Sequence, residues 1–177
     1  MDKIKVLVVD DHTLMRDGIR ALLRADGDIN IVGEASEGKG AIQQAQELAP
    51  DVIIMDIAMS GVGGLEATRK IKNRNSKVKI LILTQYAIKE YMLGAIKAGA
   101  DGYLPKIALG KDLLSAIHEV YAGAFFLYPA VASALVDEYQ HQSENADPHD
   151  LLTPRQRQTI KLIADGHNGR NSPKQSC

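Results

Sequence analysis

The sequence predicts an α/β fold, a doubly wound five-stranded parallel sheet with helices on both faces and a short helical C-terminal extension. Three observations support this prediction. Short runs rich in Val and Ile alternate five times with amphipathic segments between about residues 3 and 122. The runs are apolar on both faces, as expected of strands in the middle of a parallel sheet. Strand–helix alternation is the pattern of a sheet whose connecting helices cover both faces.

The elements are expected in a regular order. The strand-like runs are residues 5–9, 29–32, 52–57, 78–83 and 102–104. Apolar residues at helical spacing follow each run and should face the sheet. In chain order they are Leu14, Ile19, Leu22 and Leu23; Ala41, Ile42, Ala45 and Leu48; Leu65, Thr68 and Ile71; Met92, Ala95 and Ile96; and Leu113, Leu114, Ile117 and Val120.

The pattern changes after Gly123, and we expect three segments in the chain. Residues 1–122 form the α/β domain. Residues 123–150 form a linker that is helical from Pro129 and polar at 141–150. Residues 151–177 begin with a helix that has Thr153 as N-cap and Pro154 at its first position. Residues 167–177 have no apolar periodicity and should be disordered.

Composition and charge narrow the class of protein. With 45% hydrophobic and 24% charged residues the chain is not wholly disordered. The net charge is −1, but residues 153–177 hold five basic residues and one acid, +4, which leaves −5 for residues 1–152. One cysteine excludes an internal disulfide framework. The N-terminus does not resemble a signal peptide, and the uncharged stretch 120–136 is shorter than the ~20 residues of a membrane span. We expect a cytoplasmic chain with no membrane partner.

Polar side chains cluster where the predicted strands end. Asp10 and Asp11 follow the first strand, Asp56 lies near the end of the third, Thr84 follows the fourth and Lys106 follows the fifth. Parallel α/β sheets bind ligands beyond the carboxyl ends of their strands. Clustered carboxylates repel one another unless a cation neutralises them, and oxygen ligands suit Mg²⁺. A metal, a lysine and a hydroxyl beside one carboxylate are suited to phosphoryl transfer.

A simpler interpretation is that each acid only caps the helix that follows it, since Asp is favourable near a helix N-terminus. That interpretation is reasonable for any one of these residues. The coincidence of five such residues at their respective strand ends argues against it.

Four segments resemble the receiver domain of bacterial two-component response regulators: VLVVDDH (6–12), VIIMDIAM (52–59), LILT (81–84) and AGADGYLPK (98–106). They agree with that family in order, spacing and strand context, and the resemblance covers residues 3–122. The segment LTPRQRQTIKLIADGH (152–167) resembles the start of the helix-turn-helix output domain of the NarL/LuxR-type subfamily.

The resemblance implies a flavodoxin-like sheet with strand order 2-1-3-4-5 and a set of functional residues. Asp56 would be the phosphoacceptor and a sensor histidine kinase the phosphodonor. Lys106 would pair with the phosphoryl group or with Asp56, Thr84 would move toward the phosphate, and Tyr103 would swing inward. Mg²⁺ would be held by Asp10, Asp11, Asp56 and the backbone carbonyl of Ala58.

Phosphorylation would then alter the surface of the fourth helix, fifth strand and fifth helix, by favouring one of two pre-existing states. Homodimerisation on activation is expected, and the protein would not be an enzyme acting on an external substrate. Phe125 and Phe126 either cover the end of the last receiver helix or contribute to a dimer or interdomain contact.

The output function leaves two hypotheses. A helix-turn-helix reads DNA with its second motif helix, and residues 153–177 have room for one credible helix, so we expect the recognition helix to be absent. One hypothesis is a phosphorylation-controlled DNA-binding transcription regulator of which this chain is an incomplete form. The alternative is a receiver that acts without DNA, by dimerisation or as a phosphate sink.

Overall fold

A computed structural model describes residues 3–85 and 89–129 of the chain. The chain divides into two compact units, Met1–Phe126 and Leu127–Cys177. The described residues therefore cover nearly all of the first unit. The helical run expected from Pro129, the polar linker, the helix at 151–164 and the disordered tail lie outside the described residues, apart from Pro129 itself. Within the described ranges, no helix has both the length and the apolar character needed to cross a membrane.

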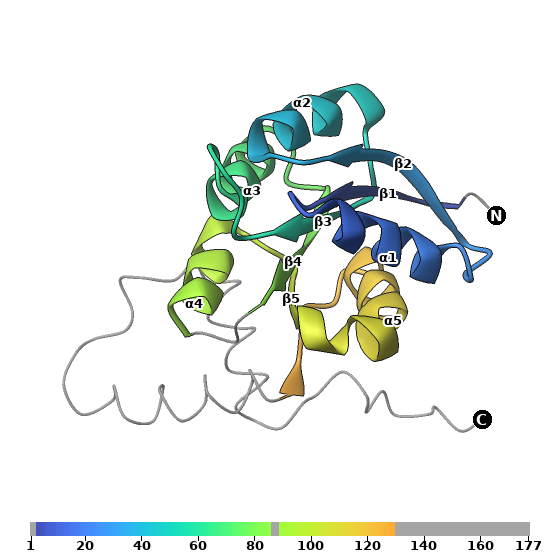
Figure 1. The fold of residues 1–177 in the computed structure, drawn as a ribbon. Helices are drawn as coiled ribbons and strands as arrows, with labels where there is room; N and C mark the ends of the chain where they lie inside the picture. The colour runs from blue at the N-terminus through green and yellow to red at the C-terminus, as the bar shows by residue number, and fades with distance from the viewer. Residues whose placement is uncertain (1–2, 86–88, 130–177) are drawn as a thin grey trace, which may run out of the picture. The chain divides into compact units, whose positions relative to one another are not determined.

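Six strands form one sheet in the order β2-β1-β3-β4-β5-β6 (Figure 1). The first five are β1 (Ile4–Val9), β2 (Ile29–Ala35), β3 (Val52–Asp56), β4 (Lys79–Thr84) and β5 (Gly102–Pro105). Every pairing among these five is parallel. The predicted fold class and the strand order 2-1-3-4-5 are thus confirmed.

The predicted number of strands was one too few. The sixth strand, β6 (Phe126–Leu127), has two residues, and the Phe126 N–H donates to the Asp101 carbonyl at 3.1 Å. A two-residue strand is too short to produce a periodic pattern of apolar residues, and for this reason it was not predicted. Phe125 and Phe126 are both half-buried. The Phe126 Cβ lies close to Gly102, so this segment packs against β5. The two expected roles of Phe125 and Phe126, covering the end of the last receiver helix or contributing to a dimer or interdomain contact, stay predictions.

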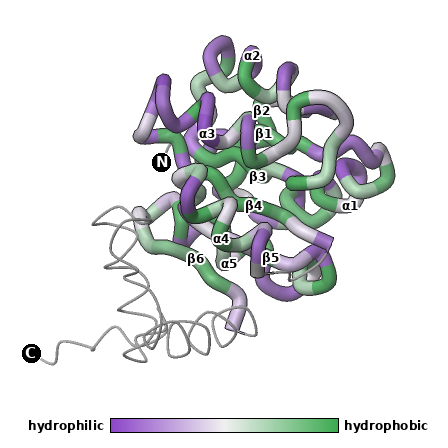
Figure 2. Tube along the Cα trace, turned by 90° about the vertical axis from the view of Figure 1, so that its left-hand side faces the viewer, coloured by the Kyte–Doolittle hydropathy of each residue, from purple (hydrophilic) through white to green (hydrophobic). Residues whose placement is uncertain are grey.

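Helices cover both faces of the sheet. Figure 1 shows α1 (Thr13–Leu23) and α5 (Leu109–Tyr121) on one side, and α2 (Gly38–Leu48), α3 (Gly64–Arg74) and α4 (Lys89–Ala98) on the other. A short 3₁₀ turn, η1 (Lys106–Ala108), joins β5 to α5. The hydrophobic residues concentrate on the inner strands, and hydrophilic ones on the outer helices (Figure 2). All five residues of β3 are buried, which makes it the centre of the core.

The predicted stripe of α1 is wrong at Leu14, whose exposed fraction is 84%. Ile19 and Leu23, in contrast, are each 1% exposed and face the sheet. At 3.6 residues per turn, Leu14 points about 180° away from Leu23. The apolar pattern of this helix therefore contains one residue that belongs to the outer surface.

Two glycines let the helices on one face approach the end of β3 closely. A Cβ at Gly64, the first residue of α3, would overlap the carbonyl oxygen of Asp56. A Cβ at Gly38, the first residue of α2, would overlap the Val62 carbonyl, which accepts a hydrogen bond from the Gly38 N–H at 3.1 Å. The loop between β3 and α3 is therefore held against the strand that ends in Asp56.

The close approach at Gly64 leads to a testable prediction. We expect Gly64→Ala to lower the free energy of unfolding by about 1–3 kcal/mol, the usual cost of overpacking. Gly18→Ala is the matched control, since Gly18 lies in the exposed middle of α1 with nothing within 4 Å of an added Cβ. That change should be neutral or stabilise by up to about 1 kcal/mol. Equal unfolding midpoints of the two variants in urea would contradict the prediction.

Candidate functional site

The strand register brings the predicted site residues to one edge of the sheet. The β1–β3 pairing places Val9 opposite Met55, so Asp10 and Asp56 occupy the next positions of two neighbouring strands. The β3–β4 and β4–β5 pairings continue this arrangement: Asp56 lies opposite Leu83, just before Thr84, and Thr84 lies opposite Pro105, just before Lys106. Residues far apart in the sequence therefore meet because their strands end at the same level.

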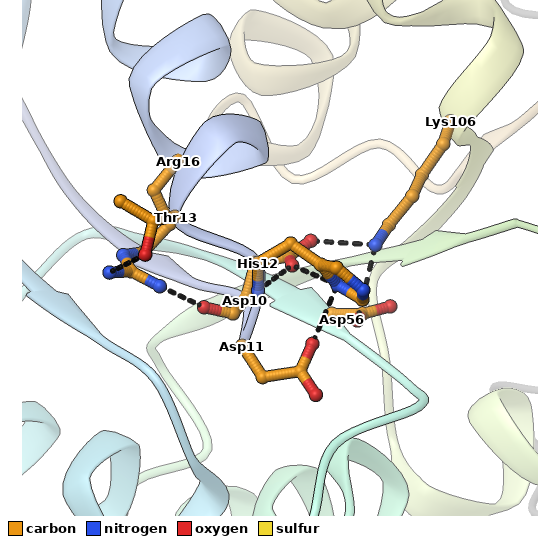
Figure 3. A network of polar contacts seen from close by, with 7 residues as sticks. All are labelled: Asp10, Asp11, His12, Thr13, Arg16, Asp56 and Lys106. Atoms are coloured by element: carbon orange, nitrogen blue, oxygen red, sulfur yellow. Dashed lines mark hydrogen bonds and ion pairs between the residues drawn. The ribbon is translucent and has the colours of Figure 1, made fainter.

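Lys106 joins two buried carboxylates at the centre of this edge. Its Nζ lies 2.7 Å from Asp10 Oδ2 and 3.1 Å from Asp56 Oδ2 (Figure 3). The Asp10 side chain is fully buried, that of Asp56 is 2% exposed and that of Lys106 is 12% exposed. Apart from Lys106, these two carboxylate oxygens have no hydrogen-bonding partner among the residues that the structure describes. One ammonium therefore faces two carboxylates, and a negative charge remains that a further cation can neutralise.

This arrangement shifts the pKa values of both partners. Burial raises the pKa of Asp56, the negative charge of Asp10 raises it further, and Lys106 acts in the opposite direction. Burial alone would lower the pKa of Lys106, but its hydrogen bond to Asp10 and the charges of Asp56 and Asp10 raise it above the usual value. Lys106 is therefore a permanent cation in the site.

Asp11 and His12 complete the acidic side of the site. The His12 N–H donates to Asp10 Oδ1 at 2.9 Å, and His12 Nδ1 lies 2.8 Å from Asp11 Oδ1. His12 is also the N-cap residue of α1, as its position after the acid pair suggests. One potential ligand atom each from Asp10, Asp11, His12 and Asp56 lies within 4.8 Å of the others. Three carboxylates at this separation fit the coordination of a divalent cation such as Mg²⁺.

The loop after β3 reaches the site through its backbone. Ala58 is exposed, and its N–H donates a hydrogen bond to the Asp56 carboxylate that acts to lower the pKa of that group. The neighbouring backbone is folded tightly, because the Ile57 carbonyl accepts hydrogen bonds from the N–H groups of Met59 and Gly64 at 3.2 and 3.1 Å. The Ala58 N–H therefore contacts the Asp56 carboxylate, while the role of the Ala58 carbonyl as a ligand stays a prediction.

Thr84 and Tyr103 are the remaining predicted residues of the site. Thr84 is 3% exposed and Tyr103 is 1% exposed, so the ring lies inside the protein in this structure. Burial raises the pKa of the Tyr103 phenol, and a hydrogen bond with the Thr84 side chain acts against that rise. The two residues predicted to change position together are thus already in contact.

The sequence did not single out Arg16 or Glu34. Arg16 Nη1 donates to the backbone carbonyl of Asp10 at 2.7 Å, and its Nε lies 3.4 Å from Glu34 Oε2 on β2 (Figure 3 shows the first contact). No motif links the two residues, since they meet only when β2 pairs with β1. The spacing of Arg16 after the acid pair was the one available signal.

Comparison with known proteins identifies the relatives of this chain. The model of the response regulator receiver domain matches residues 6–118. The transcriptional regulatory protein LiaR of Bacillus subtilis is 40% identical over 163 residues, which cover 92% of this chain and 77% of LiaR. The response regulator VraR of Staphylococcus aureus is 38% identical over 165 residues, which cover 93% of this chain and 78% of VraR.

Solved structures show the same similarity. A crystal structure of a LuxR-family two-component response regulator from Aurantimonas superposes with a TM-score of 0.75 and 33% sequence identity. The superposition covers 78% of this chain and 99% of that chain. This chain therefore shares its fold with the Aurantimonas response regulator.

The crowded carboxylates lead to a prediction about stability. Because the pKa of Asp56 is raised in the folded chain, the folded state binds more protons than the unfolded state, and the ionised carboxylate costs stability as pH rises. Asp56→Asn should therefore raise the melting temperature at pH 7.5 in EDTA, by about 2–4 °C if the gain is ~1 kcal/mol.

The gain of Asp56→Asn should shrink as pH falls into the carboxyl range, where Asp56 of the parent is protonated. Asp17→Asn serves as control, because Asp17 lies on the exposed face of α1. Parent and Asp56→Asn chains that melt together at every pH would refute the prediction.

Proposed function

The chain belongs to the response regulator receiver family and is a two-component response regulator of the NarL/LuxR type, and we propose that Asp56 accepts a phosphoryl group from the phosphohistidine of a sensor kinase. The observation that carries this proposal is the position of Asp56. It is a buried carboxylate at the end of β3, beside Asp10 and 3.1 Å from the Lys106 ammonium.

The reaction moves one phosphoryl group between two side chains. A carboxylate oxygen of Asp56 attacks phosphorus and forms a P–O bond, while the P–N bond of the phosphohistidine breaks and the imidazole nitrogen keeps the electron pair. The product is an aspartyl phosphate. Lys106 remains beside the carboxyl group throughout and offsets the negative charge of the transferring group.

Asp10 and Asp11, with Asp56 and the Ala58 carbonyl, are the groups we assign to Mg²⁺. When bound, Mg²⁺ supplies positive charge that offsets the carboxylates and the phosphoryl oxygens. The fit rests on the carboxylates of Asp10, Asp11 and Asp56, whose ligand atoms lie within 4.8 Å of one another. The single cation Lys106 leaves net negative charge at this edge, which favours a divalent partner.

Thr84 and Tyr103 connect the site to the surface formed by α4, β5 and α5. Thr84 ends β4 one position beyond Leu83, the residue paired with Asp56, and its hydroxyl can donate to a phosphoryl oxygen. Tyr103 of β5 is buried and in contact with Thr84. A hydrogen bond from Thr84 to a phosphoryl group would favour one arrangement of this pair, and with it one arrangement of α4, β5 and α5.

We assign the output of this switch to transcription. The relative LiaR is named as a transcriptional regulatory protein, and the Aurantimonas relative as a LuxR-family regulator. Retention of promoter DNA by the phosphorylated chain in a gel-shift titration at moderate salt would support this output. A phosphorylated chain that shows no retention of promoter DNA in the same titration would favour the receiver-only alternative, in which the chain acts by dimerisation or as a phosphate sink.

The phosphoacceptor assignment predicts a specific loss. With Mg²⁺ and acetyl phosphate, the intact-mass spectrum of the parent should gain one phosphoryl group, and EDTA should prevent it. Asp56→Asn should gain none, because the amide cannot form an acyl phosphate under these conditions. Asp17→Asn, an exposed carboxylate on α1, should behave as the parent. A phosphoryl group that persists in Asp56→Asn would disprove the assignment.

The entrance of the site carries two exposed apolar side chains. Leu14 follows the acid pair in the first turn of α1, and Ile107 directly follows Lys106 in η1. Their exposed fractions are 84% and 93%, the two highest among the exposed large hydrophobic residues of the described chain. Apolar side chains exposed beside a reaction site are suited to contact the protein that delivers the phosphoryl group.

Replacing these side chains should separate protein donors from small donors. Leu14→Ser and Ile107→Ser should each slow transfer from a phosphorylated histidine kinase that is active on the parent by about tenfold, as expected for loss of ~1.4 kcal/mol of contact. The rate with acetyl phosphate should not change. Tyr121→Ser, at the far end of α5, is the matched exposed control. Equal slowing with both donors would contradict a docking role.

A further inference from the structure

We propose that Arg16, held by Glu34, is a positioning residue that fixes the turn carrying the Mg²⁺ ligands Asp10 and Asp11. The inference rests on the proposed function, because it concerns the affinity of the same site for its cation. It assigns a role to a side chain that does not itself touch the carboxylates of the site.

Both backbone polar groups of Asp10 are hydrogen-bonded, the N–H to β2 and the carbonyl to Arg16 of α1. The Asp10 N–H donates to the Ala35 carbonyl at 3.1 Å. The Asp10 carbonyl accepts a hydrogen bond from Arg16 Nη1 at 2.7 Å (Figure 3). The first bond continues the sheet, while the second replaces the sheet bond that is no longer available after β1 ends. The turn is therefore held at the residue where the strand stops.

Arg16 is itself held in place. Its side chain is 16% exposed, and its Nε lies 3.4 Å from Glu34 Oε2. The other Glu34 oxygen accepts hydrogen bonds from Arg20 at 2.8 Å, and the Glu34 carbonyl accepts one from Gln44 at 2.7 Å. Glu34 lies opposite Val8 in the β1–β2 register. The anchor of Arg16 is thus part of the sheet, one position before the end of β2.

The chemistry of the guanidinium suits this role. A planar fork with five N–H donors can serve a carbonyl and a carboxylate together, whereas a lysine ammonium acts as a single point charge. Asp10 and Asp11 are consecutive acids whose charges repel each other. Holding their backbone in one conformation reduces the ordering cost that the cation would otherwise have to offset. Groups that orient metal ligands typically contribute tenfold to a hundredfold in affinity.

A positioning role and a simple charge effect predict opposite results. Arg16 is a cation, so its removal should strengthen binding of Mg²⁺ if only its charge matters. If Arg16 positions the turn, its removal should weaken binding. Arg16→Lys distinguishes the two further, because it keeps the charge and loses the fork. A weaker affinity in both variants is therefore the signature of positioning.

The experiment is a calorimetric titration of the full chain with MgCl₂, repeated with Mn²⁺ followed by electron paramagnetic resonance. We expect Arg16→Ala to raise the dissociation constant about tenfold, Arg16→Lys to raise it by a similar factor, and Glu34→Gln to raise it less. Arg20→Ala is the matched control, because Arg20 lies on the same helix and binds the same Glu34 without contacting Asp10. It should bind Mg²⁺ as the parent does.

Phosphorylation supplies a second measurement. When the rate of phosphorylation by acetyl phosphate is titrated with Mg²⁺, Arg16→Ala should need about tenfold more Mg²⁺ than the parent to reach half of its maximal rate. Melting curves establish that each variant is folded, and Arg16→Lys carries the test if Arg16→Ala does not fold.

The possible outcomes separate the two proposals. Folded Arg16 variants that bind Mg²⁺ as well as the parent, or better, overturn the positioning role. So does an equal loss of affinity in Arg20→Ala, which would assign the effect to ion pairing with Glu34 in general. A parent chain that neither binds Mg²⁺ nor accepts a phosphoryl group would overturn the proposed function itself.

Discussion

The sharing of one ammonium by two buried carboxylates is the interaction on which the rest of the site depends. Lys106 approaches Asp10 and Asp56 within 3.1 Å, at the ends of three different strands. Burial makes each charge costly, and the cost is accepted only because the opposite charge is adjacent. One cation for two anions leaves the site incomplete. That incompleteness supports our proposal that the site binds a divalent cation and that Asp56 accepts a phosphoryl group.

Some residues of this site can be predicted from the sequence, and others cannot. Asp10, Asp56, Thr84 and Lys106 were predictable because each follows an apolar run, and parallel strands end together. The fold class followed from the same alternation. Leu14 was wrongly predicted to face the sheet, because the prediction considered that the residue is apolar and neglected its angular position on the helix. Arg16 and Glu34 could not be predicted, since their meeting depends on strand pairing between residues that share no motif.

Close backbone contacts at glycines shape the site together with its charged side chains. Gly64 allows the start of α3 to lie against the carbonyl of Asp56, and the loop between them turns back on Ile57. A side chain at that position would push the loop, and with it Ala58, away from the carboxylate. The acidic residues are therefore placed by their strands, while the backbone groups around them are placed by the absence of side chains. Both kinds of placement have to hold for the site to exist.

The separation of Asp10 and Lys106 in the sequence also has a consequence for the synthesis and folding of the chain. The carboxylates are synthesised early, on β1 and β3, and the lysine comes only after β5. A nascent chain that has not yet released Lys106 from the ribosome holds the acids without their counter-charge. Non-local parallel pairings of this kind also form slowly, because a long loop must close before any contact forms. The cluster of Asp10, Asp56 and Lys106 is therefore complete only after β5 has been synthesised and has paired with β4.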